Sequence, residues 1–199
     1  AVPHRDPWAR PLSAALLAAF VAKLGIALWG VGRGFELGDE GFLLLNLNHP
    51  ASSPRFFEFY KLLLLLDEPP RIGVVAARLL RIATELAASV ALVAGVLAWA
   101  RARIFAPGAL PTTALVGFCG LGALLGAASR SLSYNDVTNL CVFGAAGAVF
   151  YAASRPPGAW RAPAALLAAG FLTGFQLFVK FPPALVGIAA VGLALAVWL

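Results

Sequence analysis

Apolar runs of about 20 residues, bounded by charged residues or proline, constrain the fold of this chain more than any other feature. The hydrocarbon core of a bilayer is about 30 Å thick, so a helix of roughly 20 apolar residues crosses it. The sequence contains about six runs of this length if the chain turns at Lys180-Phe181-Pro182-Pro183, because two prolines interrupt a helix there. The expected spans are residues 12–31, 72–100, 108–128, 137–153, 164–179 and 184–199. The sequence therefore predicts an all-α, polytopic transmembrane helical bundle that forms a single domain over residues 1–199.

The composition favours a membrane protein and excludes several other classes. Hydrophobic residues make up 61% of the chain and charged residues 12%, against roughly 45–50% apolar and 25% charged in soluble domains. This hydrophobicity excludes intrinsic disorder, and two cysteines cannot form a disulfide framework. The formal net charge is +6, but the basic residues are scattered singly among apolar runs, so we expect no nucleic-acid partner.

Lysine and arginine in the short loops predict the orientation of the bundle. With the N-terminus in the cytoplasm, the cytoplasmic segments are residues 1–11, 101–107 and 154–163. They carry as many basic residues as the external segments, which are about twice as long, so the density of basic residues is higher on the cytoplasmic side. Nearly all acidic residues then lie outside, and only Asp6 remains in the cytoplasm. Any chemistry is therefore expected to face away from the cytoplasm.

The first external loop, residues 32–71, is far longer than two neighbouring spans require, and such loops are usually functional. It carries two adjacent acids, Asp39 and Glu40, soon after the first span. These acids suit a solvated loop, the first turn of a helix or a catalytic site. Helix neighbours point about 100° apart, so one acid could be a base while the other is structural. Residues 56–66 combine aromatic residues, two charges and a leucine run, which predicts a short helix in the outer interface.

The second span carries its polar residues on one face. Arg71, Arg78, Arg81, Glu85 and Ser89 fall within an arc of about 80° on a helix. Charges within a bilayer normally face a cavity or a partner. An Arg81–Glu85 ion pair, four residues apart, is one interpretation. It leaves Arg78 unexplained, so the pattern favours an anionic ligand.

The turn before the fourth span and the turn after the fifth add further polar residues. Asn135 or Asp136 is suited to cap the fourth span, and Tyr134 suits an interfacial aromatic belt. Lys180 is either an interface anchor or a second cation for a phosphate. The sequence alone does not choose between these two roles.

The third and fourth spans are rich in small residues, which allow helix backbones to approach closely in lipid. They include Gly117, Gly120, Gly122, Gly126, Gly144 and Gly147. No histidine and cysteine spacing typical of a metal site is present in the sequence, and neither is a glycine-rich phosphate loop or a nucleophile elbow. A metal ion is therefore not indicated.

The order of these features resembles a known family. A span, a long external loop opening on an acid pair, and a second span that enters through Ala77-Arg78-Leu79-Leu80 and ends at Trp99-Ala100-Arg101 are similar to the N-terminal half of GT-C polytopic glycosyltransferases. Leu132-Ser133-Tyr134-Asn135 also resembles a segment of many bacterial members. The most similar group is family 39-like, related to protein O-mannosyltransferases and lipid A aminoarabinose transferases.

This resemblance implies an enzyme of the bacterial cytoplasmic membrane whose active site faces the exterior or periplasm. Its reaction would transfer a sugar, with inversion, from a polyprenyl-phosphate donor to a glycan, lipid or protein acceptor. Asp39 would be the general base and Glu40 would support the site or the acceptor. The resemblance and the charge pattern together suggest Arg78, Arg81 and Lys180 for the donor phosphate and Tyr134, Asn135, Asp136 and Glu85 as lining residues. No cofactor is expected. Because family members are usually longer, we expect the chain to be an N-terminal fragment.

Two other classes remain open from the sequence. Intramembrane charges also mark the substrate pathways of transporters and lipid flippases. A transporter usually shows an internal repeat, and the segment at residues 180–183 has no counterpart earlier in the chain. A non-catalytic membrane scaffold would leave Asp39 replaceable.

Overall fold

The computed structural model describes residues 9–34, 39–52, 71–103, 120, 122, 131–156 and 158–198. All regular elements in these residues are helical, which confirms the predicted all-α fold. In chain order they are α1 (Ala9–Gly30), α2 (Asp39–Asn48), the 3-10 helix η1 (Pro50–Ser52), α3 (Val74–Arg103), α5 (Tyr134–Ala153), α6 (Arg161–Val179) and α7 (Phe181–Trp198). The predicted interfacial helix at 56–66, and the third span except Gly120 and Gly122, lie outside the described residues.

Four of these helices, α1, α3, α5 and α6, are long and apolar enough to cross a membrane. A shorter apolar stretch, Phe181–Leu193, begins α7. The chain therefore has the helices of a multi-pass membrane protein, and the predicted spans match them to within a few residues.

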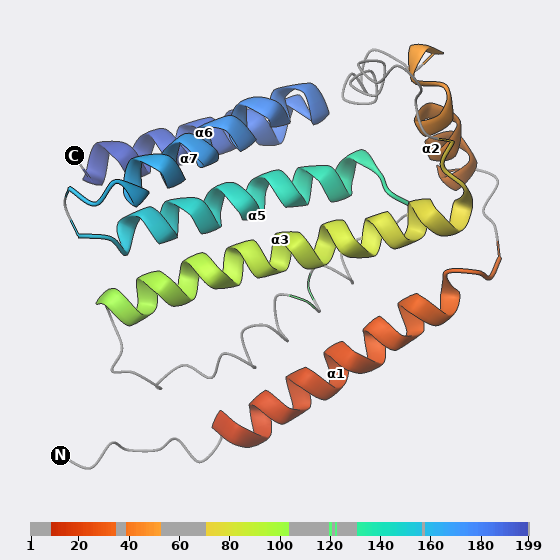
Figure 1. Ribbon diagram of the computed structural model, residues 1–199, viewed down its shortest axis with the longest axis horizontal. Helices are drawn as coiled ribbons and strands as arrows, with labels where there is room; N and C mark the ends of the chain where they lie inside the picture. The colour runs from red at the N-terminus through yellow and green to blue at the C-terminus, as the bar shows by residue number, and fades with distance from the viewer. Residues whose placement is uncertain are drawn as a thin grey trace.

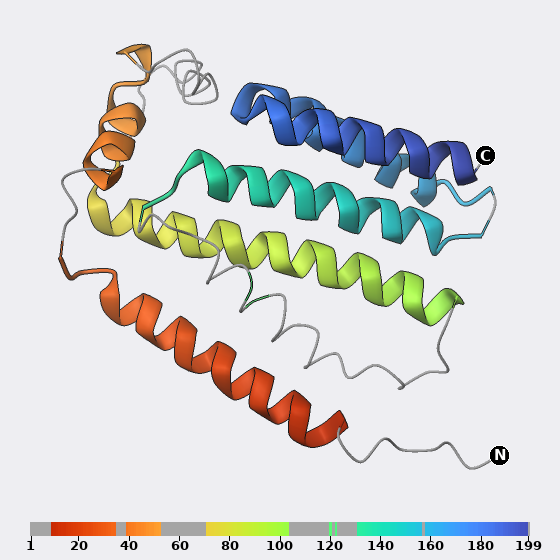
Figure 2. The same cartoon turned by 180° about the vertical axis from the view of Figure 1, so that it is seen from behind.

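The long helices lie side by side, and α2 runs across one end of the bundle (Figures 1 and 2). Helix α5 packs against α3 on one side and against α6 on the other, and α7 packs against both α6 and α5. Helices α3 and α5 begin at the end where α2 lies, and the junction of α6 with α7 lies at that end too (Figure 1). Residues distant in sequence are thereby brought to one end.

The contact between α3 and α5 depends on glycine. A Cβ atom at Gly95 would lie 2.0 Å from the carbonyl oxygen of Gly147, and one at Gly147 would lie 2.2 Å from that of Ala91. Both distances are far below van der Waals contact, so the two backbones touch where side chains are absent. This confirms that small residues of the fourth span allow close approach.

Helix α5 begins differently from the prediction. Its N-cap is Ser133, whereas Asn135 or Asp136 was expected to cap it. The backbone N–H of Ser133 donates to Asp136 Oδ2 at 2.6 Å, and the Asp136 N–H donates back to Ser133 Oγ at 3.4 Å. This is a capping box, which satisfies two backbone donors reciprocally and moves the start of the helix to Tyr134.

The turn between α6 and α7 is shorter than expected. Lys180 alone, in an extended conformation, separates the two helices. Pro182 and Pro183 lie within the first turn of α7, where the missing N–H has no helical partner to lose. The prolines therefore start the helix and do not form the turn.

The two ends of the bundle differ in their buried acidic residues. We call one the arginine end, after Arg101, Arg103, Arg155 and Arg161. There the Arg103 guanidinium donates to the carbonyl of Ala153 at 3.3 Å, and Arg155 lies 4.1 Å from the ring centroid of Tyr151. The opposite end, where α2 lies, carries the buried acids Glu40, Glu85 and Asp136, and we call it the acid-bearing end.

Candidate functional site

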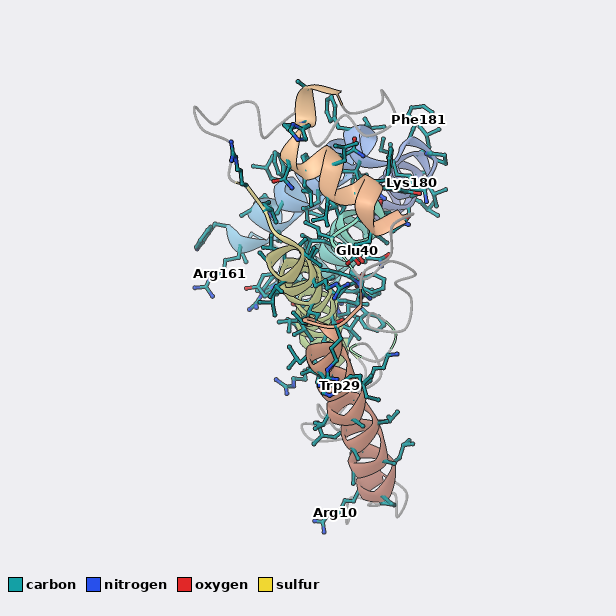
Figure 3. The ribbon with its side chains drawn as sticks, turned by 90° about the vertical axis from the view of Figure 1, so that its right-hand side faces the viewer. Arg10, Trp29, Glu40, Arg161, Lys180 and Phe181 are labelled. Atoms are coloured by element: carbon teal, nitrogen blue, oxygen red, sulfur yellow. The ribbon has the colours of Figure 1, made fainter. Side chains whose placement is uncertain are left out.

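The acid-bearing end brings together most residues that the sequence singled out. They come from α2, the first turns of α3, the segment before α5, the start of α5 and the α6–α7 junction. Figure 3 looks onto this end, with Glu40 and Lys180 labelled. Three sets of contacts organise it, centred on Arg78, Arg81 and Lys180.

The first set is a buried ion pair between Glu40 and Arg78. Their side chains are 0% and 3% exposed. Arg78 Nε donates to Glu40 Oε1 and Arg78 Nη2 donates to Oε2, each at 2.7 Å, which is the bidentate geometry of a strong pair. The hydroxyl of Ser131 donates to Glu40 Oε1 at 2.5 Å. Glu40 therefore connects α2 to α3 and to the segment before α5.

Arg78 also binds the end of α1. Its Nη1 donates to the carbonyl oxygens of Gly30 at 3.2 Å, Val31 at 2.8 Å and Arg33 at 3.0 Å, and its Nη2 donates to that of Gly34 at 2.6 Å. Gly30 ends α1, and its carbonyl also accepts from the Arg33 N–H at 3.0 Å. The other three carbonyls belong to the turn after α1, so the guanidinium fixes this turn against α3.

These contacts change the interpretation of Arg78. All three of its nitrogens donate within the protein, and the side chain is buried. In this arrangement the guanidinium has no N–H directed to a phosphate. The suggested role as a phosphate ligand is therefore less suited to Arg78 than the joining of α1, α2 and α3.

The second set centres on Arg81. Its Nε lies 3.5 Å from Asp136 Oδ1, so this ion pair crosses from α3 to α5, whereas the sequence suggested a pair with Glu85 along α3. Glu85 instead accepts a hydrogen bond from Asn139 Nδ2 at 3.1 Å, and its carboxyl group also interacts with that of Asp136. Glu85 and Asp136 are both 0% exposed.

Several atoms of this second set lack hydrogen bonds. Within the described residues Arg81 Nε, Glu85 Oε2 and Asp136 Oδ1 are buried and have no hydrogen-bond partner. One arginine faces two buried carboxyl groups, which is an expensive arrangement in a bilayer. Such a cluster is more typical of a functional site than of simple packing.

The third set surrounds Lys180 and is the most accessible. The Lys180 ammonium donates to Asn135 Oδ1 at 3.1 Å and lies 5.1 Å from the ring centroid of Tyr134. Lys180 is partly exposed and Asn135 is exposed. An ammonium has three donors, so this cation is suited to an anion arriving from outside.

Asp39 is the first residue of α2, but its side chain lies outside the described residues. Its backbone is nevertheless adjacent to Glu40, and so it lies beside the Arg78 contacts. The structure places the start of α2 at the acid-bearing end, and the role of Asp39 stays a prediction.

The sequence analysis missed three polar residues of this end: Ser131, Ser133 and Asn139. The spacing of Ser133 and Asp136 is the signature of a capping box and could have identified Ser133. Asn139 lies one turn after Asn135 on α5, but nothing in the sequence indicates that it faces Glu85. Among the described residues no group of three or more His, Cys, Asp and Glu could hold a metal ion.

Comparisons of the chain with protein-family models, with curated proteins and with solved structures found no match.

Proposed function

We propose that this chain is part of a membrane glycosyltransferase that transfers a sugar, with inversion, from a polyprenyl-phosphate donor to an acceptor outside the cytoplasm. The observation that carries the proposal is the Glu40–Arg78 pair, because it fixes the acid-bearing start of α2 against α3. Lys180, in the junction of α6 with α7, lies at the same end of the bundle as α2 (Figure 1). A carboxylate and a cation at one membrane surface are what transfer from a lipid phosphate to a hydroxyl requires.

In this proposal the two acids of α2 have different roles. Asp39 is the general base and takes the proton of the acceptor hydroxyl, which requires a distance of about 3 Å. Glu40 is a positioning residue: its bonds to Arg78 and Ser131 hold the first turn of α2 in place. In this proposal the buried Glu40–Arg78 pair thereby holds the neighbouring general base, Asp39, in a fixed position.

The leaving phosphate is assigned to Lys180, with Arg81 behind it. Developing negative charge on a lipid phosphate is stabilised by cations held in a preorganised site. Lys180 is partly exposed, and Arg81 Nε makes an ion pair with Asp136 Oδ1 at 3.5 Å but no hydrogen bond within the described residues. Both are better suited than Arg78, whose nitrogens already donate to Glu40 and α1.

The proposed orientation places the arginine end in the cytoplasm of a bacterium, because basic residues accumulate on that side of membrane proteins. The acid-bearing end then faces the exterior or periplasm, where lipid-linked sugars are used in the family that the sequence resembles.

The test is Asp39→Asn in the longest form of the protein that contains this chain, reconstituted with a polyprenyl-phosphate sugar and an acceptor extract. We expect transfer to fall at least about 100-fold with donor binding retained, because loss of a general base typically costs 10²–10⁴-fold. Glu58→Gln, another acid of the same loop, is the matched control and should transfer normally. Normal turnover in the Asp39 variant would remove this residue from the mechanism.

A transporter or lipid flippase is the second candidate. The Arg81, Glu85 and Asp136 cluster favours it, because buried charges between helices often mark substrate pathways. Movement of a fluorescent polyprenyl-phosphate lipid across vesicles without acceptor would favour this activity over transfer. A vesicle assay that shows transfer without such movement would favour the enzyme.

A further inference from the structure

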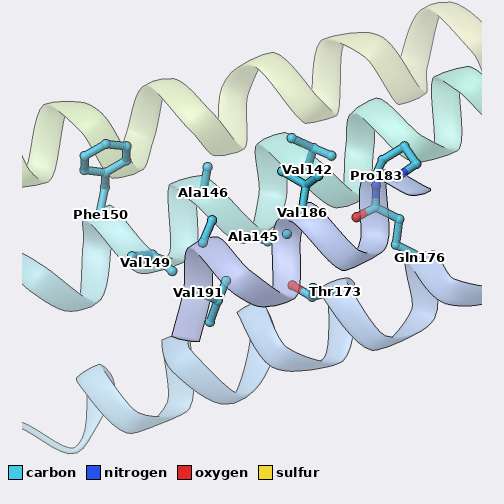
Figure 4. Close-up of a pocket in the computed structure, with 12 residues that line it drawn as sticks. Val142, Ala145, Ala146, Val149, Phe150, Thr173, Gln176, Pro183, Val186 and Val191 are labelled. Carbon is cyan, nitrogen blue, oxygen red and sulfur yellow. The ribbon is translucent and has the colours of Figure 1, made fainter. Parts of the chain in front are cut away.

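A lateral cavity of about 520 Å³ lies between α5, α6 and α7 (Figure 4), and its lining includes neither Glu40 nor Arg78. Its volume is within the roughly 300–1,000 Å³ of typical ligand pockets. Its walls are mainly apolar, with Val142 and Phe150 from α5 and Val186 from α7. Val142 and Val186 are 38% and 70% exposed, so the cavity opens at the side of the bundle, toward lipid.

Gln176 of α6 is the polar residue that sets this cavity apart. Its side chain lines the cavity, is 1% exposed, and its Nε2 has no hydrogen-bond partner within the described residues. A buried amide without a partner is costly in an apolar environment, and native proteins rarely leave one unpaired. The geometry therefore favours a ligand that carries a hydrogen-bond acceptor at the depth of Gln176.

A cation, Lys180, lies directly after the last residue of α6. The backbone N–H of Lys180 donates to the carbonyl of Gln176 at 2.8 Å, so the two residues are about 6 Å apart along the axis. Pro183, just beyond Lys180, also lines the cavity. From the surface inward the order is therefore an ammonium, an amide donor and an apolar cavity.

This order matches the chemistry of a glycerophospholipid, in which the ester carbonyls connect the phosphate to the acyl chains. We propose that the lateral cavity binds one acyl chain of a glycerophospholipid, with Gln176 donating to its ester carbonyl and Lys180 facing its phosphate. A polyprenyl phosphate has a phosphate and a hydrocarbon chain but no ester carbonyl. The unpaired amide therefore favours the phospholipid over the sugar donor, and the two lipids would compete for Lys180, which the proposed function assigns to the donor phosphate.

Two phospholipids that share a headgroup and chain length but differ in linkage test the role of Gln176. Native mass spectrometry of the purified protein would measure the binding of an ester-linked phosphatidylglycerol and of its diether analogue. We expect the wild-type protein to prefer the ester about threefold to tenfold, which is the effect of one hydrogen bond. The variant Gln176→Leu should bind both lipids equally, since it removes the donor and keeps the size of the side chain. Equal binding by the wild-type protein would overturn the assignment of Gln176.

A matched pair of variants on α7 tests the cavity. Ala190 lines it, whereas its neighbour Ala189, which is about 100° away around the helix, does not. Ala190→Phe should fill the cavity and abolish retention of phospholipid after detergent purification, and Ala189→Phe should retain it. Equal retention by the two variants, retention of polyprenyl phosphate alone, or a cross-linked second copy of the chain over the cavity would each overturn the proposal.

Discussion

At the scale of single residues, Arg78 does the most to define the acid-bearing end. Its guanidinium binds a buried carboxylate and the terminal carbonyls of α1 at once. In a low-dielectric environment the loss of one member of a buried ion pair leaves the other charge uncompensated. The stability of this end therefore depends on both members.

Arg78→Met is expected to lower the free energy of unfolding by about 3–5 kcal/mol, because it removes the guanidinium from a buried carboxylate. Thermal unfolding in detergent would measure the change. Arg71→Met, which removes an exposed arginine just before α3, is the control and should stay within about 0.5 kcal/mol of the wild type. Equal stability of the two variants would mean that Arg78 serves a ligand and not the fold.

Glu85→Gln is expected to leave the free energy of unfolding unchanged or to raise it. The amide oxygen still accepts from Asn139, and the change removes one of two acids that face a single arginine. Asp136→Asn, by contrast, should destabilise the protein by about 1–3 kcal/mol, because Asp136 carries both the capping box and the Arg81 pair. Unfolding curves of both variants, measured under the same conditions, give the two changes in free energy of unfolding. A larger loss for Glu85→Gln than for Asp136→Asn would contradict this prediction.

At the scale of elements, the interface between α3 and α5 shows what a sequence can and cannot predict. The bounds of these spans followed from hydropathy, and the glycines of α5 indicated close packing. The residue of α3 that each glycine contacts could not be predicted from the sequence, because it depends on the register between the two helices. For the same reason the sequence predicted that Arg81, Glu85 and Asp136 lie in one region, but it did not predict the ion pair of Arg81 with Asp136 between α3 and α5.

Gly147→Ala tests this interface. Because the added methyl group meets backbone atoms of α3, which cannot rotate away, we expect a loss of about 1–3 kcal/mol in the free energy of unfolding. Gly170→Ala on α6, where nothing lies within 4 Å of the new atom, is the matched control and should be neutral or stabilising by up to about 1 kcal/mol. Unfolding midpoints that fall equally for both would place the effect in the helix itself, not in the contact.

At the scale of the whole molecule, the buried acids lie at one end of the bundle, whereas arginines lie at both ends. The arginine end and the acid-bearing end are joined by helices that run between them (Figure 1). Helix α6 connects exposed aromatic residues at its two ends, Trp160 and Phe181. Trp160 and Phe181 are therefore suitable positions for measuring the orientation of the helices in the membrane.

Single cysteines at these two positions, in a background with Cys119→Ser and Cys141→Ser, test the topology. In intact cells a membrane-impermeant thiol reagent should label Phe181→Cys and leave Trp160→Cys unlabelled until the membrane is broken, because basic ends stay in the cytoplasm. Labelling of Trp160→Cys in intact cells would reverse the proposed orientation.

The contacts of Glu40 also set an order of events during synthesis. Its arginine lies 38 residues later in the chain and its serine 91 residues later. A ribosome therefore delivers the carboxylate well before either partner, and the surface built on α2 is completed only once the chain has passed Ser131. Maturation of this surface is thus tied to translation of the start of α5, and a nascent chain halted before that point would present Glu40 without its serine.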